Sequence, residues 1–127
     1  MSNRCGLLFI KILKRGGLVM RTLKFIVDGQ IITKDPHCDF EGLVPGSAGY
    51  LKAEFAFSSE WNGTAKVAAF YSPMGREFTP KVLDDGKSCM IPADATKGGA
   101  FQVKVIGQRG DFEIGTNKIL VNQNGGK

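Results

Sequence analysis

The residues best equipped for chemistry are three in a row, His37, Cys38 and Asp39. Imidazole, thiolate and carboxylate groups are all zinc ligands. Neighbouring residues of an extended chain point to opposite sides, however, and the sequence has no second histidine and no Cys-x-x-Cys pair to complete a site. We therefore expect an exposed polar loop there, without a metal.

A catalytic role for Cys38 meets a similar difficulty. A cysteine nucleophile needs a separately positioned base, and the only histidine of the chain is its immediate neighbour. Residues 96–99, Thr-Lys-Gly-Gly, lack the full glycine spacing and the following helix of a phosphate-binding loop. We therefore expect a non-enzymatic protein with no cofactor. The odd number of cysteines favours synthesis in a reducing compartment, with a Cys38–Cys89 bridge left open as an alternative.

Two further positions have a binding interpretation beside a structural one. Arg109, Gly110 and Asp111 lie between two strand-like runs, where this tripeptide can present a cation and a carboxylate to a receptor as an interaction loop. A charged turn in which glycine relieves the backbone is the preferred interpretation. Trp61 follows a strand whose apolar residues point inward, so we expect a core anchor rather than a ring that stacks on a sugar.

The elements that must position these residues are short strands separated by turns. Leu51, Phe55 and Phe57 belong to a run in which apolar residues recur at every second position, the period of a half-buried strand. The dipeptide Asn62-Gly63 tolerates positive φ and predicts a reversal into a second strand over residues 64–71. Residues 49–71 therefore predict a hairpin, which needs a second layer to cover its apolar face.

The rest of the chain predicts that second layer. Strand-like runs cover residues 23–27, 31–32, 76–83, 88–91, 101–106 and 112–121, with a long loop at 34–48 and one helical turn at 93–97. About seven to nine short strands predict an all-β fold, an antiparallel immunoglobulin-like β-sandwich. The expected core anchors are Phe25, Leu51, Phe55, Phe57, Trp61, Val67, Phe101, Val103 and Val105.

The net charge of +5 is concentrated at the N-terminus. Four of the 17 basic residues and none of the 12 acidic ones lie in residues 1–19, which leaves 13 basic against 12 acidic residues in the body. A nearly neutral body without a basic stripe argues against nucleic-acid binding. We expect a basic, apolar extension over 1–19, upstream of a natural start at Met20, a sandwich domain over 20–122 and a flexible tail over 123–127.

Two blocks of the sequence resemble a small domain common in phages and prophages of Gram-positive bacteria. The first is GYLKAEFAFSSEWNG at residues 49–63, followed by KVAAF at 66–70. The second is CMIPA at residues 89–93, followed by GGAFQVKVIG at 98–107. The resemblance covers roughly residues 23–121. It implies an immunoglobulin-like sandwich of tail, baseplate or fibre proteins, and it supplies no catalytic residue.

The resemblance leads us to expect a virion structural protein, made in the bacterial host cytoplasm, that decorates a capsid or serves a tail or baseplate. Its expected partners are other virion proteins, in a homo-oligomer or symmetric assembly, and not nucleic acid. One alternative is an adhesin module that binds a host-surface receptor or glycan. A second is a small membrane-active or regulatory protein that uses the basic N-terminus as an amphipathic helix, although a membrane is the less favoured partner.

Overall fold

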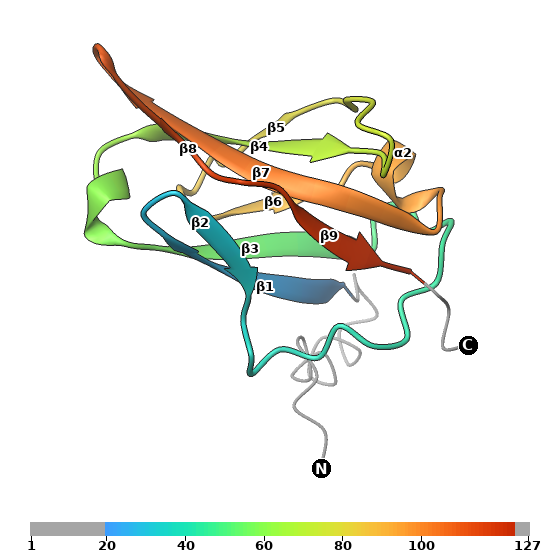
Figure 1. The fold of residues 1–127 in the computed structure, drawn as a ribbon. Coiled ribbons are helices and arrows are strands. Elements are labelled where there is room, and N and C mark those ends of the chain that lie inside the picture. The colour runs from blue at the N-terminus through green and yellow to red at the C-terminus, as the bar shows by residue number, and fades with distance from the viewer. Residues whose placement is uncertain (1–19, 124–127) are drawn as a thin grey trace.

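The computed structural model describes residues 20–123, and in it two β-sheets pack face to face (Figure 1). The first sheet has the strand order β2-β1-β3-β6, and the second has the order β5-β4-β7-β8 with β9 also paired to β7. The strands are β1 (Arg21–Asp28), β2 (Ile31–Lys34), β3 (Leu51–Phe57), β4 (Ala65–Tyr71), β5 (Lys81–Val82), β6 (Ser88–Met90), β7 (Ala100–Arg109), β8 (Phe112–Gly115) and β9 (Ile119–Asn122). Two short helices, η1 (Ser59–Trp61) and α2 (Ala93–Thr96), complete the described part of the chain.

This arrangement confirms the all-β sandwich, with one departure from a purely antiparallel fold. Strands β1 and β3 run parallel over seven paired residues, from Arg21 opposite Leu51 to Val27 opposite Phe57. A parallel pair needs a long connection, which β2 and the loop at 35–50 supply. Arg21 fastens this loop, because its Nη2 donates to the carbonyl oxygens of Asp39 at 2.8 Å and Glu41 at 2.6 Å.

The core lies between the sheets and is built from alternate residues of the longer strands. In β7 the residues Phe101, Val103 and Val105 are fully buried, whereas the intervening positions face outward. Phe25 and Phe55 face each other across the parallel pair, with ring centroids 5.4 Å apart. Of the expected core anchors, the structure buries Phe25, Leu51, Phe55, Trp61, Phe101, Val103 and Val105.

The other two expected anchors, Phe57 and Val67, are only half-buried. Phe57 closes one end of the sandwich, where its ring lies 5.0 Å from that of Trp61. The assignment of Val67 to the core is wrong, because Ala68 and Phe70 are the inward residues of β4. Alternation then turns Val67 to the outer face.

The hairpin expected over residues 49–71 is also wrong. The chain does reverse beside Gly63, which has a φ of +77°, but β3 belongs to the first sheet and β4 to the second. Helix η1 carries the chain across, because Trp61 is drawn into the space between the layers. The turn at Gly86 likewise joins two sheets, from β5 to β6, instead of two strands of one hairpin.

Two expected strands are shorter than their sequence patterns. The run at 76–83 keeps only β5, since Pro80 has no amide hydrogen to donate to a neighbouring strand. The run at 112–121 is divided into β8 and β9, because the chain between them turns toward β2. There Asn117 accepts the Ile32 N–H through Oδ1 at 2.9 Å and donates its own N–H to the Gln30 carbonyl at 3.1 Å.

The domain extends one residue past the expected boundary at 122. Gln123 is buried, and its Nε2 donates to the carbonyl oxygens of Thr96 at 3.1 Å and Gly98 at 2.9 Å. These bonds fasten the end of β9 to the segment between α2 and β7. The expected extension at 1–19 and the rest of the expected tail, 124–127, lie outside the described residues.

Candidate functional site

Trp61 is a structural residue at the crossover between the sheets. Its side chain is 0% exposed, and its indole Nε1–H donates to the Gly29 carbonyl oxygen at 2.8 Å. Gly107 of β7 lies directly against the ring, since a Cβ there would stand 2.8 Å from two ring carbons. With neither face of the indole accessible, Trp61 does not offer a surface on which a sugar can stack.

The tripeptide Arg109-Gly110-Asp111 lies at the tip of the β7–β8 hairpin, which projects beyond the body of the sandwich (Figure 1). Arg109 does not reach outward beside Asp111. Its Nη1 donates to the Asn62 carbonyl oxygen at 2.6 Å, and its guanidinium carbon lies 4.5 Å from the centroid of the Phe112 ring. The cation is thus held along the hairpin, while the exposed carboxylate of Asp111 marks its end.

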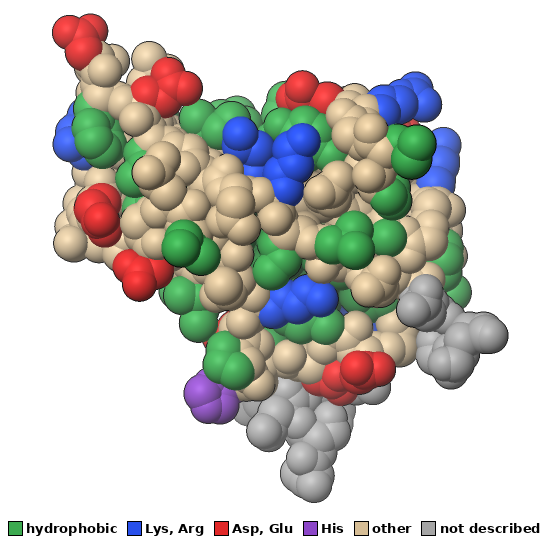
Figure 2. All heavy atoms as spheres, in the orientation of Figure 1, with side chains coloured by type: hydrophobic (Ala, Val, Ile, Leu, Met, Phe, Trp, Pro, Cys, Tyr) green, Lys and Arg blue, Asp and Glu red, His purple; other side chains and the backbone are tan. Residues whose placement is uncertain are grey.

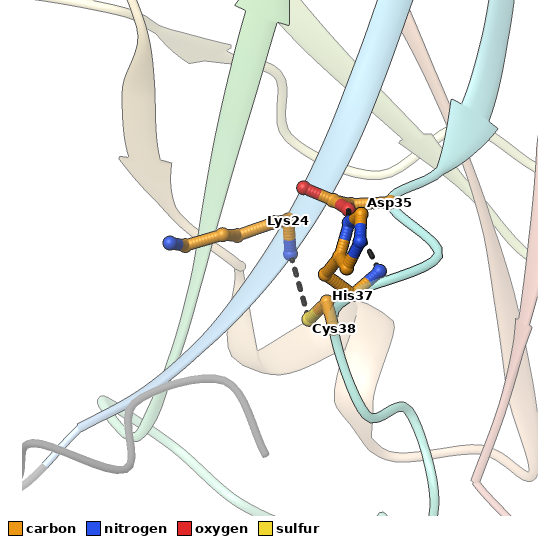
Figure 3. A network of polar contacts seen from close by, with 4 residues as sticks. All are labelled: Lys24, Asp35, His37 and Cys38. Atoms are coloured by element: carbon orange, nitrogen blue, oxygen red, sulfur yellow. Dashed lines mark hydrogen bonds and ion pairs between the residues drawn. The ribbon is translucent and has the colours of Figure 1, made fainter. Parts of the chain in front are cut away.

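Figure 3 shows the polar network at His37 and Cys38, in the loop that follows β2. The His37 N–H donates to the Asp35 carboxylate at 2.8 Å, and the His37 ring, whose side chain is 88% exposed, approaches the same oxygen at 3.5 Å. The backbone N–H of Lys24 donates to Cys38 Sγ at 3.3 Å. These contacts close a tight turn beside β1. Residues 20–123 contain no group of three or more side chains placed to hold a metal ion.

Cys89 of β6 lies in a shallow hollow of about 410 Å³ between the edges of the two sheets, lined also by Lys81 and Val82 of β5. It is a free cysteine, so the alternative of a Cys38–Cys89 bridge is wrong. Burial raises the pKa of the Cys89 thiol to about 12, despite the opposing charge of Lys81. The thiol is therefore protonated at neutral pH and is a poor nucleophile.

The accessible apolar side chains form a different kind of site, which the sequence patterns did not reveal. Each large hydrophobic residue that is exposed in the described part of the chain lies on an edge strand or in a connecting loop, and none on an inner strand. These residues are Ile31 on β2, Val82 on β5, Phe112 on β8, Leu120 on β9, and Val44, Tyr50 and Met74 in loops.

A second apolar feature crosses the outer face of the second sheet. Val67 of β4 pairs with Val82 on one side and with Ile106 of β7 on the other, and Ile106 pairs in turn with Gly115 of β8. The sequence did hold a signal for this row: Val105 and Ile106 are consecutive apolar residues in a strand that otherwise alternates. Apolar residues at adjacent positions indicate a strand with apolar groups on both faces.

The fold and these surfaces define a small two-sheet β-sandwich whose accessible apolar groups lie along its edges and on one outer face. Within residues 20–123, no helix is long and apolar enough to cross a membrane. Comparison of the chain with protein-family models, with curated proteins and with solved structures finds no match. The resemblance to the phage domain therefore rests on the two sequence blocks alone.

Proposed function

We propose that this chain is a non-enzymatic structural protein of a phage or prophage particle, either a capsid decoration or an accessory of the tail or baseplate. It acts by binding other virion proteins. The observation that carries the proposal is the distribution of exposed apolar residues, which lie on the edges and loops where a sandwich meets its neighbours.

The edge strands support this proposal because each sheet has an exposed apolar side chain on an edge strand. Sheet edges are commonly blunted by outward charges, and an apolar edge residue favours contact with another chain. Ile31 on β2 is 60% exposed and Val82 on β5 is 61% exposed, each on the edge strand of its sheet. Both sheets thus offer an apolar edge to a partner.

The blocks that resemble the phage domain supply core residues of the sandwich. Most of their large side chains are buried, among them Phe55, Trp61, Ile91 and Phe101. Such residues specify the sandwich, while the edges and loops that surround them are free to differ in chemistry and select the partner. The resemblance therefore concerns the scaffold, and it fits a family in which the same sandwich serves several positions in a particle.

A symmetric particle also explains how short edge strands can hold the protein in place, although each interface is weak. An individual edge strand of two to four residues, such as β5 or β2, offers few hydrogen bonds. When many copies bind a repeating lattice, each further contact forms at a high effective concentration, and the whole assembly is held much more tightly than one interface.

The test is the location and stoichiometry of the protein in purified particles. Quantitative mass spectrometry of virions and of separated capsids and tails is expected to find the chain at a fixed ratio to one major structural protein. Ile31→Lys should reduce that ratio without changing the melting curve, because a lysine on β2 opposes pairing at the edge. Thr79→Lys, which adds the same charge at an exposed loop position, is the matched control.

The result that would overturn the proposal is a soluble protein absent from purified particles. If particles lack it while glycan or host-cell binding is found, the adhesin function takes precedence, with Tyr50 or Phe112 in place of the buried Trp61 as the contacting aromatic.

A further inference from the structure

The outer face of the second sheet carries an unusual combination of apolar and charged rows. Val82, Val67, Ile106 and Gly115 are paired neighbours across β5, β4, β7 and β8, so the side chains of the first three share one face of the sheet. This face points away from the core, which Val103 and Val105 enter from the opposite side of β7. We call this line of four residues the apolar row.

Charged residues of opposite sign flank the apolar row. On one side lies Lys104, the next outward residue of β7, and near it Lys118, whose Nζ is 3.9 Å from the centroid of the Tyr71 ring. On the other side lies Glu113, paired with Gln108, and beyond it Asp111 at the hairpin tip. Figure 2 shows acidic side chains at the projecting tip and a group of Lys and Arg side chains near the middle of the body.

The basic side also carries one carboxylate, that of Glu77, which pairs with Tyr71. The ion pairs of His37 with Asp35 and of Lys97 with Asp94 lie away from this face, and within residues 20–123 no ion pair involves the flanks of the apolar row. The face therefore combines an apolar centre with one side on which Lys104 and Lys118 outnumber Glu77 and one side that carries Glu113 and Asp111. Lys104 and Glu113 face each other when this pattern is turned over onto itself.

We propose that this face binds a second copy of the chain, with the two-fold axis lying along the apolar row. Rotation about that axis places row on row and exchanges the two sides, so Lys104 of each copy meets the side that carries Glu113 of the other. The two groups then lie about one strand spacing, ~4.8 Å, apart along the row, within reach of a lysine side chain. A two-fold axis parallel to the strands would instead set Lys104 against Lys104, which like charges oppose.

The size of the face indicates a weak dimer. Four strands with a spacing of ~4.8 Å cover about 19 Å, and five residues of strand cover about 17 Å. This area is well below that of a standard stable interface, so we expect dissociation in the micromolar to millimolar range and a reversible dimer. The inference does not depend on a virion role, since it follows from the face alone.

The experiment is sedimentation equilibrium of the full chain at low ionic strength, with two charge reversals. Lys104→Glu and Glu113→Lys should each weaken self-association at least about tenfold, because each replaces two symmetric attractions by two repulsions. A mixture of the two variants should associate again, since the carboxylate introduced at position 104 of one chain then meets the ammonium introduced at position 113 of the other. The remaining native pair, Glu113 of the first chain and Lys104 of the second, is also attractive. Lys24→Glu, at an exposed position of β1 in the other sheet, should have no effect.

Two results would overturn the proposal. One is a wild-type chain that remains monomeric up to about 1 mM, the weak end of the expected range. The other is a mixture of folded Lys104→Glu and Glu113→Lys chains that associates no better than either alone. Circular dichroism of each variant shows that it is folded, and self-association that weakens with added salt is the further expected result.

Discussion

Two of the three connections that carry the chain between the sheets are built in opposite ways. The first, residues 58–64, is organised around Trp61, which is fully buried and bonded to Gly29. The second, residues 83–87, is organised around the exposed Asp85, whose carboxylate accepts the backbone N–H groups of Lys87 and Ser88 at 2.9 and 2.7 Å and the Ser88 hydroxyl. The first connection therefore stabilises the domain through a buried aromatic ring. The second begins at the buried Leu83, but its turn is held by local hydrogen bonds at the surface.

The largest effect is expected from Trp61→Ala. Removing the indole leaves a cavity between the sheets and deprives the Gly29 carbonyl of its donor. We expect a loss of about 3–5 kcal/mol in the free energy of unfolding, as for other aromatic truncations in cores. Urea denaturation measures it. Trp61→Phe, which keeps an aromatic ring but not the N–H, should lose less, and equal losses would contradict a contribution from the packing of the ring.

Gly107→Ala tests the same crossover from the β7 side. A Cβ at this position would stand 2.8 Å from the Trp61 ring and 2.9 Å from Thr64 Oγ1, so the packed core must shift. We expect a destabilisation of about 1–3 kcal/mol, typical of overpacking. Gly99→Ala, where a Cβ meets nothing within 4 Å, is the matched control. In the Trp61→Ala background the cost of Gly107→Ala should largely vanish, and strict additivity would show that the two residues do not interact.

The crossovers also show what could be predicted from the sequence. Alternation predicted the inward residues of β3 and β7, and the glycine-containing turns predicted at Gly63 and Gly110 both have positive φ. The residue types of a turn predict that the chain reverses direction. They do not predict which sheet the next strand joins. Of these two turns, only the one at Gly110 joins strands of one sheet, so the topology depended on the burial of Trp61, a contact between distant residues.

The candidate surfaces were less predictable than the core. Val67 was assigned inward because valine suits a buried strand, yet the small Ala68 takes the inward position of β4. The apolar row needs residues of four strands brought into register, and a single sequence does not specify which strands are neighbours. Arg109 and Asp111 were predicted as a pair, but the contact of Arg109 with Asn62 joins positions 47 residues apart.

Asp85→Asn tests the second crossover, and its effect should depend on pH. The hydrogen bond from the Ser88 hydroxyl, followed by those from the backbone of Lys87 and Ser88, holds the pKa of Asp85 well below its ordinary value of 3.8. A carboxyl whose pKa is lowered by folding stabilises the protein above its unfolded pKa, and this contribution is lost as the pH falls through the folded pKa.

Asp85→Asn should therefore lower the urea midpoint at pH 7, by less than Gly107→Ala does, and this difference from the wild type should shrink toward about pH 2. Asp84→Asn, at the adjacent exposed residue, is the matched control. A difference that stays constant with pH would assign the effect to the shape of the turn and not to the charge.

The smallest effect is expected from Arg109→Ala, which tests whether the β7–β8 hairpin stabilises the first crossover. Arg109 connects the two through its bond to the Asn62 carbonyl and its packing on Phe112, but it is exposed to solvent throughout. We expect a loss of about 0.5–1 kcal/mol, the range of a cation–aromatic contact at the surface. Arg109→Lys keeps the charge and should recover part of it. A loss as large as that of Trp61→Ala would mean that the hairpin is part of the first crossover. The contrast between a connection stabilised by a buried ring and one held by hydrogen bonds at the surface would then fail.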